Sequence, residues 1–286
     1  MKRKDFSDAT LNEFTYGGSE RKIAVILDGE PYMLKFRKRN VYGSCFNDVA
    51  EYLASHIFSL LGVKSQDTDL GQYKGECVVA CKDFRIGSSF VPFSSVGESS
   101  LEEGSNRNGY SYSDIETLIF KNLKLAEREA AVSLFWETYV IDALLANPDR
   151  HGHNWGYLKD HDTYRVAPIF DNGSSLFSSF SSLEEMSYVL TDQKEIDERV
   201  YETPVSLINQ GKTVSSYYDV LVKGNYPRLA KALKKIFPRI NLEEIYALID
   251  SVEDLEPIRK QFLKRIITER YHKILEVAYL RKDLSK

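Results

Sequence analysis

The run EREAAVSLFWETYVIDALLAN, residues 127–147, constrains the fold more than any other part of the chain. Apolar residues recur along it at helical spacing and leave too little polar surface for a helix that faces water. They are Ala130, Leu134, Phe135, Val140, Ile141, Leu144 and Leu145. We therefore predict a helix that other elements bury. The chain has 286 residues, which is enough for one large domain or two closely packed lobes.

The first third of the chain predicts short strands around one helix. Two β-rich runs, Arg21–Asp28 and Tyr32–Phe36, are separated by Gly-Glu-Pro and predict a hairpin. A helical pattern follows, with Asn47 as its expected cap and Gly62 as its expected left-handed stop. The run Glu76–Cys81 predicts a further strand. Together these elements indicate a compact β-α-β unit.

The rest of the chain predicts mainly helices. We expect a loop over Arg85–Asn108, a helical pattern from Ser113 onward, and a flexible surface segment over the serine-rich, uncharged Gly173–Leu183. The last helical segment carries an apolar stripe made of Ile258, Phe262, Ile266, Ile274 and Val277. It also carries a basic row made of Arg259, Lys260, Lys264, Arg265, Arg270 and Lys273. We expect the row to be a solvated face, and docking of RNA or an acidic substrate is the alternative.

The composition excludes several classes of protein. With 38 Lys+Arg against 42 Asp+Glu, the formal net charge of −4 gives no general attraction to nucleic acid or membranes. No apolar run approaches the roughly 18–20 residues of a membrane helix. The three cysteines, Cys45, Cys77 and Cys81, are too few for a disulfide framework and lack a second pair at zinc spacing. We expect a cytoplasmic protein; the sequence leaves secretion or translocation into a host open.

The segment NPDRHGHNWG gathers acidic, basic and amide side chains directly after the predicted buried helix. Asp149 and Asn154 have the spacing of a kinase catalytic loop, in which the carboxylate accepts a hydroxyl proton and the amide binds Mg²⁺. After the predicted strand Tyr164–Phe170, Asp171 stands where a kinase places its second metal ligand. The alternatives are a loop in which Asp149 caps a turn and a histidine packs on the tryptophan, and a common Asp-Asn-Gly turn.

Lys35 lies in the predicted strand YMLKF, from which it can reach the phosphates of ATP as a point charge. Glu51, on the helix that follows, is its expected carboxylate partner. A surface lysine is the alternative, because Arg37, Lys38 and Arg39 are close in the sequence.

The run YGGSERK places Gly17 and Gly18 immediately before the first predicted strand. Glycines let backbone N–H groups approach phosphates closely. The pattern matches neither the Walker A motif nor G-x-G-x-x-G, so a plain turn is an equal alternative.

Taken together, these motifs resemble the HipA-like serine/threonine kinases in their short, single-module form. The resemblance runs along most of Gly17–Gly173, and the joint order of the motifs is specific although no single motif is. The matching segments are YGGSERK, YMLKF, EYLASHIFSLLGV, VVACKDF, NPDRHGHN and APIFDNGSS. The resemblance implies an α+β, bilobal, protein-kinase-like fold that binds ATP between its lobes. The expected lobes are a small β-rich N-lobe over residues 1–84 and a larger helical C-lobe over residues 85–286.

The resemblance also implies a role for each motif residue. Lys35 would contact the ATP phosphates, and Asp149 would be the catalytic base. Asn154 and Asp171 would hold Mg²⁺, and His151 would support the catalytic loop.

Around the nucleotide, the resemblance implies a further set of residues. They are Gly17, Gly18, Ser19, Lys35, Glu51, Val79, Cys81 and Asp83. Backbone groups of Val79–Asp83 would line the adenine, with Asp83 near the ribose, whereas Glu20 and Arg21 depart from the family pattern and leave the phosphate contacts of the loop open. Ser19 is an expected autophosphorylation site, where a phosphate would repel the triphosphate and lower ATP affinity. A turn residue whose hydroxyl caps the loop is the alternative.

The sequence therefore predicts a kinase that uses ATP and Mg²⁺ to phosphorylate serine or threonine of a protein substrate. The resemblance adds a toxin-type growth regulator with a small DNA-binding antitoxin as partner. We expect no membrane partner and no direct binding of nucleic acid. A lipid or small-molecule kinase is the alternative, because phosphoinositide kinases share the D-R-H-x-x-N string. A nucleotide-binding pseudokinase is a third reading, although all four expected catalytic and metal residues are present.

Overall fold

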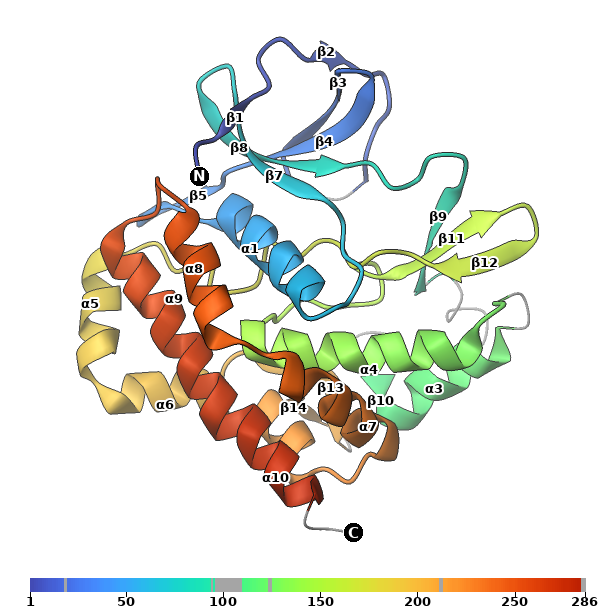
Figure 1. Ribbon diagram of the computed structural model, residues 1–286, viewed down its shortest axis with the longest axis vertical. Coiled ribbons are helices and arrows are strands. Elements are labelled where there is room, and N and C mark those ends of the chain that lie inside the picture. The colour runs from blue at the N-terminus through green and yellow to red at the C-terminus, as the bar shows by residue number, and fades with distance from the viewer. Residues whose placement is uncertain (18–19, 94, 96–109, 123–124, 211–212, 284–286) are drawn as a thin grey trace.

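The computed structural model describes residues 1–17, 20–93, 95, 110–122, 125–210 and 213–283. A small lobe built on a six-stranded sheet lies against a larger, mainly helical lobe (Figure 1). The predicted α+β organisation in two lobes is confirmed. Among the described helices, none combines the length and the apolar character that crossing a membrane requires.

The sheet of the small lobe has the strand order β1-β7-β8-β4-β3-β2. Its strands are β1 (Lys4–Asp5), β2 (Thr10–Leu11), β3 (Lys22–Leu27), β4 (Glu30–Phe36), β7 (Thr68–Tyr73) and β8 (Glu76–Lys82). Strands β3 and β4 form the predicted hairpin, and Asp28 and Gly29 both take the positive φ that such a tight turn requires. The strand predicted over Glu76–Cys81 is β8, which lies between β4 and β7.

Side chains of β4 alternate between two environments. Leu34 and Phe36 belong to a small core within the sheet, together with Phe6, Val78 and Ala80. Met33 belongs to the main core on the opposite face, and Lys35 shares this face because successive strand residues alternate. The lysine is therefore turned toward the helical lobe.

Helix α1 (Asn47–Leu60) follows a short hairpin of β5 (Arg39–Asn40) and β6 (Gly43–Ser44). We expected Asn47 to cap the helix. The N-cap is Phe46 instead, and Asn47 is the first helical residue. Its side chain accepts a hydrogen bond from the Lys38 amide and donates one to the Phe36 carbonyl, so it ties the helix to the end of β4. At the other end, Gly62 has a φ of +76°, which confirms the predicted left-handed stop.

A second sheet pairs a segment that follows the small lobe with strands beyond α4, and the sequence indicated only its strand near Tyr164. Strand β9 (Ser89–Pro92) lies within the expected loop and pairs with β11 (Gly156–Asp160), which pairs with β12 (Thr163–Val166). The strand was missed because four residues ending in proline carry no alternating pattern. The strand predicted to reach Phe170 ends at Val166. Residues 94 and 96–108 of the expected loop lie outside the described residues.

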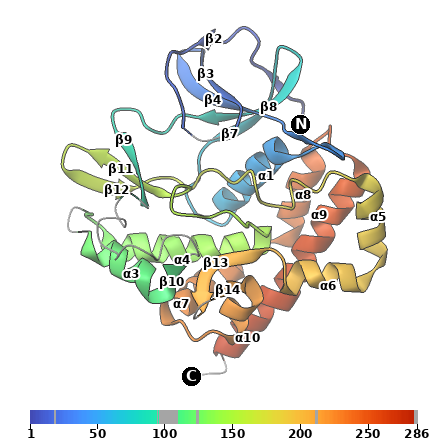
Figure 2. The same ribbon diagram turned by 180° about the vertical axis from the view of Figure 1, so that it is seen from behind.

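The larger lobe consists of helices around α4. Its helices are α3 (Tyr112–Lys121), α4 (Arg128–Leu145), α5 (Leu183–Thr191), α6 (Gln193–Tyr201), α7 (Pro227–Ile236), α8 (Leu242–Ser251), α9 (Pro257–Arg270) and α10 (Val277–Asp283), with the short helical turns η1 (Asp219–Lys223), η2 (Phe237–Arg239) and η3 (Tyr271–Glu276). A small sheet is made of β10 (Tyr110–Ser111), β13 (Val205–Gln210) and β14 (Thr213–Ser216). Helix α4 is buried as predicted, with α1, α3, α7 and α9 packed against it (Figure 2).

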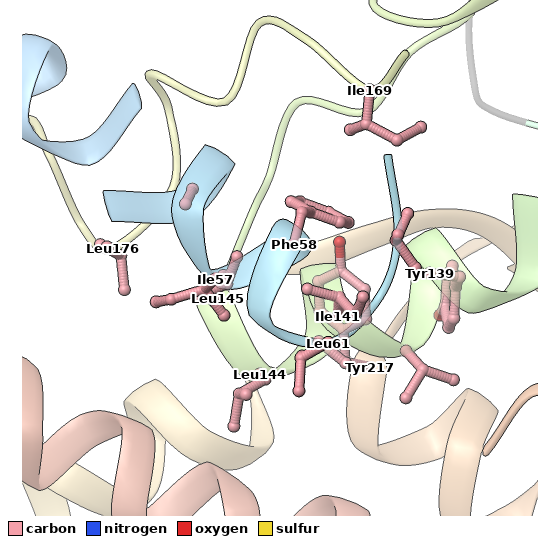
Figure 3. Packing of buried hydrophobic residues seen from close by; sticks show 14 of the residues in the cluster. Ile57, Phe58, Leu61, Tyr139, Ile141, Leu144, Leu145, Ile169, Leu176 and Tyr217 are labelled. Carbon is pink, nitrogen blue, oxygen red and sulfur yellow. The ribbon is translucent and has the colours of Figure 1, made fainter. Parts of the chain in front are cut away.

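The two lobes share one continuous core. Ile57, Phe58 and Leu61 near the end of α1 lie beside Ile141 and Leu144 of α4, and all five side chains are at most 1% exposed (Figure 3). Because α1 belongs to the small lobe, burial of this face fixes its position against the larger lobe.

The segment Gly173–Leu183 is a surface segment only in part, because Ser179 and Leu183 are exposed whereas other residues are buried. Ser175, Leu176 and Ser178 are buried. The Leu176 amide donates to the Leu145 carbonyl at 2.8 Å, and the Phe46 amide donates to the Ser178 carbonyl at 2.8 Å. Short uncharged residues allow this irregular chain to run between α1 and α4, where its backbone groups are hydrogen-bonded.

The basic row of the last helices is not a single solvated face either. Arg259 and Arg270 are 1% and 0% exposed and donate to backbone carbonyls. Three of the accessible cations are paired with carboxylates: Lys264 with Asp250, Arg265 with Glu269, and Lys273 with Asp197. This pairing leaves little free positive charge for RNA or an acidic substrate.

The buried Arg270 yields a test of the fold. Its guanidinium donates to the carbonyls of Ala143 and Arg199 at 2.6 Å, and to those of Val200 and Thr203 at longer distances. Arg270→Met should lower the free energy of unfolding by about 3 kcal/mol, because buried carbonyls lose a charged donor. Arg265→Met on the same helix, which removes a half-exposed side chain, should change it by less than about 0.5 kcal/mol. Equal midpoints for the two variants in urea denaturation would contradict this account.

Candidate active site

Lys35 forms the contact at which the two lobes meet. Its Nζ lies 2.8 Å from Glu51 Oε2 of α1 and 2.6 Å from Asp171 Oδ1 of the larger lobe. The residue is only 4% exposed, so the alternative of a surface lysine is wrong. Burial opposes its charge, but the two carboxylates outweigh burial and hold the pKa of Lys35 well above its ordinary value. Burial likewise opposes the charge of Asp171, and Lys35 keeps the pKa of that carboxyl below its ordinary value.

Glu51 also holds the turn that carries Asp171. Its Oε1 accepts the Asn172 amide at 2.8 Å, and its Oε2 accepts the Gly173 amide at 3.1 Å. Asp171 has a φ of +57°, a left-handed conformation that costs a non-glycine residue free energy. The two backbone hydrogen bonds to a fully buried carboxylate stabilise this conformation and keep the Asp171 side chain beside Lys35.

The segment after α4 forms a compact loop around Asp149 and Asn154. Ala146, with a φ of +52°, turns the chain out of the helix, and Asn147 Oδ1 accepts the Asp149 amide at 2.9 Å. Asn154 Nδ2 donates to the Asp149 carbonyl at 2.7 Å. This bond fixes the orientation of the amide and leaves its Oδ1 as the atom that can bind a cation. The alternative in which Asp149 caps a turn is not what the structure shows, because Asn147 is the capping residue.

Arg150 connects this loop to the turn that carries Asp171, a role that we did not predict from the sequence. Its guanidinium makes two bonds to Asp142 of α4, at 2.9 and 3.0 Å. It also donates to the carbonyls of Asn154 and Phe170 and to the side chain of Asn172. Burial disfavours the cation, but Asp142 outweighs it and raises the pKa of Arg150. The signal in the sequence was Asp142 itself, since a carboxylate within a buried helix needs a cationic partner.

The carboxylate of Asp149 has two side-chain neighbours. Ser174 Oγ donates to its Oδ2 at 3.3 Å, and His151 Nε2 lies 3.6 Å from its Oδ1. The side chains of Asp149 and His151 are 47% and 45% exposed. Asp149 is therefore the accessible acid of the site, whereas Asp171 is held by Lys35.

Strand β8 lies beside β4, and its Val79 and Cys81 side chains are fully buried. Val79 lies opposite Lys35 and Cys81 opposite Met33, so both share the face of the lysine. Burial raises the pKa of the Cys81 thiol. Both edges of β8 are hydrogen-bonded to β4 and β7, so the expectation that backbone groups of Val79 and Cys81 contact adenine is wrong.

Asp83 joins the chain after β8 to the segment before the glycine pair. Its carboxylate accepts from Tyr16 Oη at 3.0 Å and from Arg85 Nη2 at 2.6 Å. Arg85 in turn lies over the rings of Phe14 and Tyr16. Although burial alone would raise it, these hydrogen bonds lower the pKa of Asp83.

Of the glycine pair, Gly17 lies within the described residues. Gly17 is exposed, and its carbonyl accepts a hydrogen bond from Lys22. Gly18 and Ser19, which we expected beside the phosphates, lie outside the described residues.

The bonds of Glu51 yield a test of the site. Glu51→Gln should lower the free energy of unfolding by about 3 kcal/mol, because an amide cannot neutralise Lys35 and presents a donor to backbone N–H groups. Glu137→Gln is the matched control, since Glu137 is also buried on a helix but pairs with Lys235, whose side chain is 48% exposed. Its loss should be about 1 kcal/mol or less. Comparable losses in thermal and urea unfolding would show that Glu51 has no special structural role.

In protein kinases, a strand lysine pairs with a helix glutamate and lies opposite an aspartate of the helical lobe that binds metal. Lys35, Glu51 and Asp171 have this arrangement. Comparison with known proteins agrees with this class. The family model of the HipA-like C-terminal domain matches residues 14–221. Serine/threonine-protein kinase CtkA of Helicobacter pylori is 34% identical over 290 residues, which cover 97% of this chain and 88% of that protein.

Solved structures give the same result. The crystal structure of the H. pylori proinflammatory kinase CtkA superposes with a TM-score of 0.92 at 33% identity, over the whole of both chains. HipA of Shewanella oneidensis, solved with HipB and operator DNA, superposes with a TM-score of 0.64 at 15% identity, over 96% of this chain and 68% of that one, and shows the fold alone. The chain belongs to the HipA-like family. It is a kinase with the predicted bilobal fold.

Proposed function

We propose that this protein transfers the γ-phosphate of ATP to serine or threonine hydroxyls of a protein substrate, with Mg²⁺ as its metal. The observation that supports this most is the buried Lys35, held by Glu51 and Asp171 at the junction of the lobes. The relative at 34% identity is named as a serine/threonine-protein kinase, which supports the choice of acceptor.

In this function each charged group has one role. Lys35, whose pKa is raised, stays cationic at neutral pH and would hold phosphate oxygens. Asp171 and Asn154 Oδ1 would hold Mg²⁺, and these oxygen donors fit a hard divalent cation. Bound Mg²⁺ neutralises charge on the β- and γ-phosphates. Asp149 would accept the proton of the acceptor hydroxyl, for which its half-exposed carboxylate is accessible.

The rest of the nucleotide would lie near β8 and the segment after it. The adenine would lie against the segment after β8, beside the buried Val79 and Cys81, and Asp83 would bind the ribose in exchange for Tyr16. Gly17 and Gly18 would approach the phosphates. Autophosphorylation of Ser19 remains part of the proposal.

A regulatory role belongs to the same proposal. The Shewanella HipA structure holds HipB and operator DNA, which supports a search for a small DNA-binding partner of this chain and for toxin-type control of growth. We also propose a reducing, intracellular compartment, because Cys45, Cys77 and Cys81 are free thiols.

The acceptor can be identified by incubating the purified protein and a cell lysate with labelled ATP, with and without Mg²⁺. Label that appears in discrete proteins only when Mg²⁺ is present supports the proposal. Label that extracts into lipid would support the phosphoinositide-kinase alternative instead, and nucleotide binding without transfer would support a pseudokinase.

Asp149→Asn should abolish phosphoryl transfer, with a loss of at least about 10²-fold, because the acceptor hydroxyl loses its proton acceptor. The affinity for Mg-ATP, measured by calorimetry, should stay within about twofold, because the phosphate contacts remain. Asp160→Asn, at an exposed position on β11, is the matched control and should keep full activity. Normal turnover by Asp149→Asn would overturn its assignment as the base.

Asp171→Asn should act on binding. Replacing the carboxylate by an amide removes a charged metal ligand, so the Kd for Mg-ATP should rise at least about tenfold. The Kd for ATP in the presence of a chelator should change much less. If both Kd values shift equally in calorimetric titrations, Asp171 is not a metal ligand.

A further inference from the structure

Ser174 places a hydroxyl of the chain itself against the proposed catalytic base. Its Oγ donates to Asp149 Oδ2 at 3.3 Å. A general base has to lie within hydrogen-bond reach of the proton that it takes, and such contacts are often long before the other reactant is bound. Of the serines close by on the same segment, Ser175 has a buried Oγ with no hydrogen-bond partner among the described residues, and Ser181 donates to Asn40.

The backbone around Ser174 is held firmly in this place. The amides of the two preceding residues are bound by Glu51, and the Asn172 side chain contacts Arg150 and Ser55. Ser174 follows the proposed metal ligand Asp171 by three residues. The turn that carries the proposed metal ligand Asp171 thus also places the Ser174 hydroxyl against the proposed base Asp149.

We propose that Ser174 is a phosphate acceptor in cis, so that the kinase modifies its own metal turn; this rests on the proposed function. The Oγ–H bond breaks and its proton passes to the Asp149 carboxylate. A bond forms between Oγ and the γ-phosphorus of ATP. The bond from that phosphorus to the oxygen that bridges the β-phosphate breaks, and ADP leaves with the electron pair.

The product phosphate switches the enzyme off. It adds about −1.5 to −2 charges beside Asp149, on the turn that also carries Asp171. There it repels the triphosphate and occupies the position that the hydroxyl of a substrate would need. The modified turn also loses the Ser174 donor to Asp149.

Site-mapping mass spectrometry after incubation with Mg-ATP tests the proposal. Phosphate should appear on Ser174 in the wild type and in the matched control Ser175→Ala, and should be absent at this position in Ser174→Ala. Because transfer is in cis, the first-order rate constant for phosphorylation of Ser174 should not change over a 100-fold range of protein concentration. An Asp149→Asn acceptor, which keeps Ser174, should stay unmodified when it is mixed with the wild type.

The possible failures can be told apart. A wild type that phosphorylates a lysate protein or another of its own residues, but never Ser174, overturns this inference and leaves the proposed function intact. Phosphate on no protein at all overturns both. Modification of the Asp149→Asn acceptor would show transfer in trans and overturn the cis step.

A binding measurement without turnover tests the off state. With a non-hydrolysable ATP analogue and Mg²⁺, Ser174→Asp should bind about tenfold more weakly than Ser174→Ala. Ser175→Ala should bind as the wild type does. Equal affinities of Ser174→Asp and Ser174→Ala would overturn the claim that the phosphate switches the enzyme off.

Discussion

The site depends on one buried carboxylate. Glu51 accepts Lys35 Nζ and the amides of Asn172 and Gly173, and it is fully buried. A carboxylate in this environment needs its cation and its donors together, because each one that is lost leaves charge or polarity unpaired in a medium of low polarity. The position of α1, the reach of β4 and the left-handed turn at Asp171 are therefore interdependent. The small lobe cannot shift against the larger one without breaking this set of bonds.

The loop that carries Asp149 and Asn154 is braced from parts of the chain that carry no motif. Tyr217 donates to the Asn147 carbonyl at the start of the loop, and Arg270 donates to the carbonyl of Ala143 in the last turn of α4. Arg259 donates to the Phe180 carbonyl and lies over the Phe46 ring, next to the start of α1. Both arginines lie beyond residue 221, where the match to the family model ends. The last helices are thus part of the framework of the site, although they hold no expected catalytic residue.

This explains what the sequence could and could not reveal. Lys35 and Glu51 were predictable because a strand lysine and a helix glutamate lie on faces that periodicity defines. Asp171 was predictable from its place shortly after the Asp149 loop, although the strand expected to lead up to it ends at Val166. The bonds of Arg150 were not, because they reach Asp142 and Asn172 on two other segments and follow no spacing rule. Burial of the arginines in α9 was hidden for the same reason: only the folded chain brings unpaired carbonyls to them.

The balance of charge around the proposed nucleotide site favours ATP that carries a metal. Lys35 pairs with Glu51 and Asp171, Arg150 pairs with Asp142, and Asp149 lies near His151 and Ser174. Lys22 adds a third cation, whose charge acts on both Asp171 and Lys35. Four carboxylates against three cations leave this group net negative, so it would weaken the binding of free triphosphate, which is itself strongly anionic. A divalent cation held by Asp171 would reverse the local balance and would let Lys35 turn from that carboxylate toward phosphate. The acidity that would weaken the binding of free ATP would thus favour the metal–nucleotide complex.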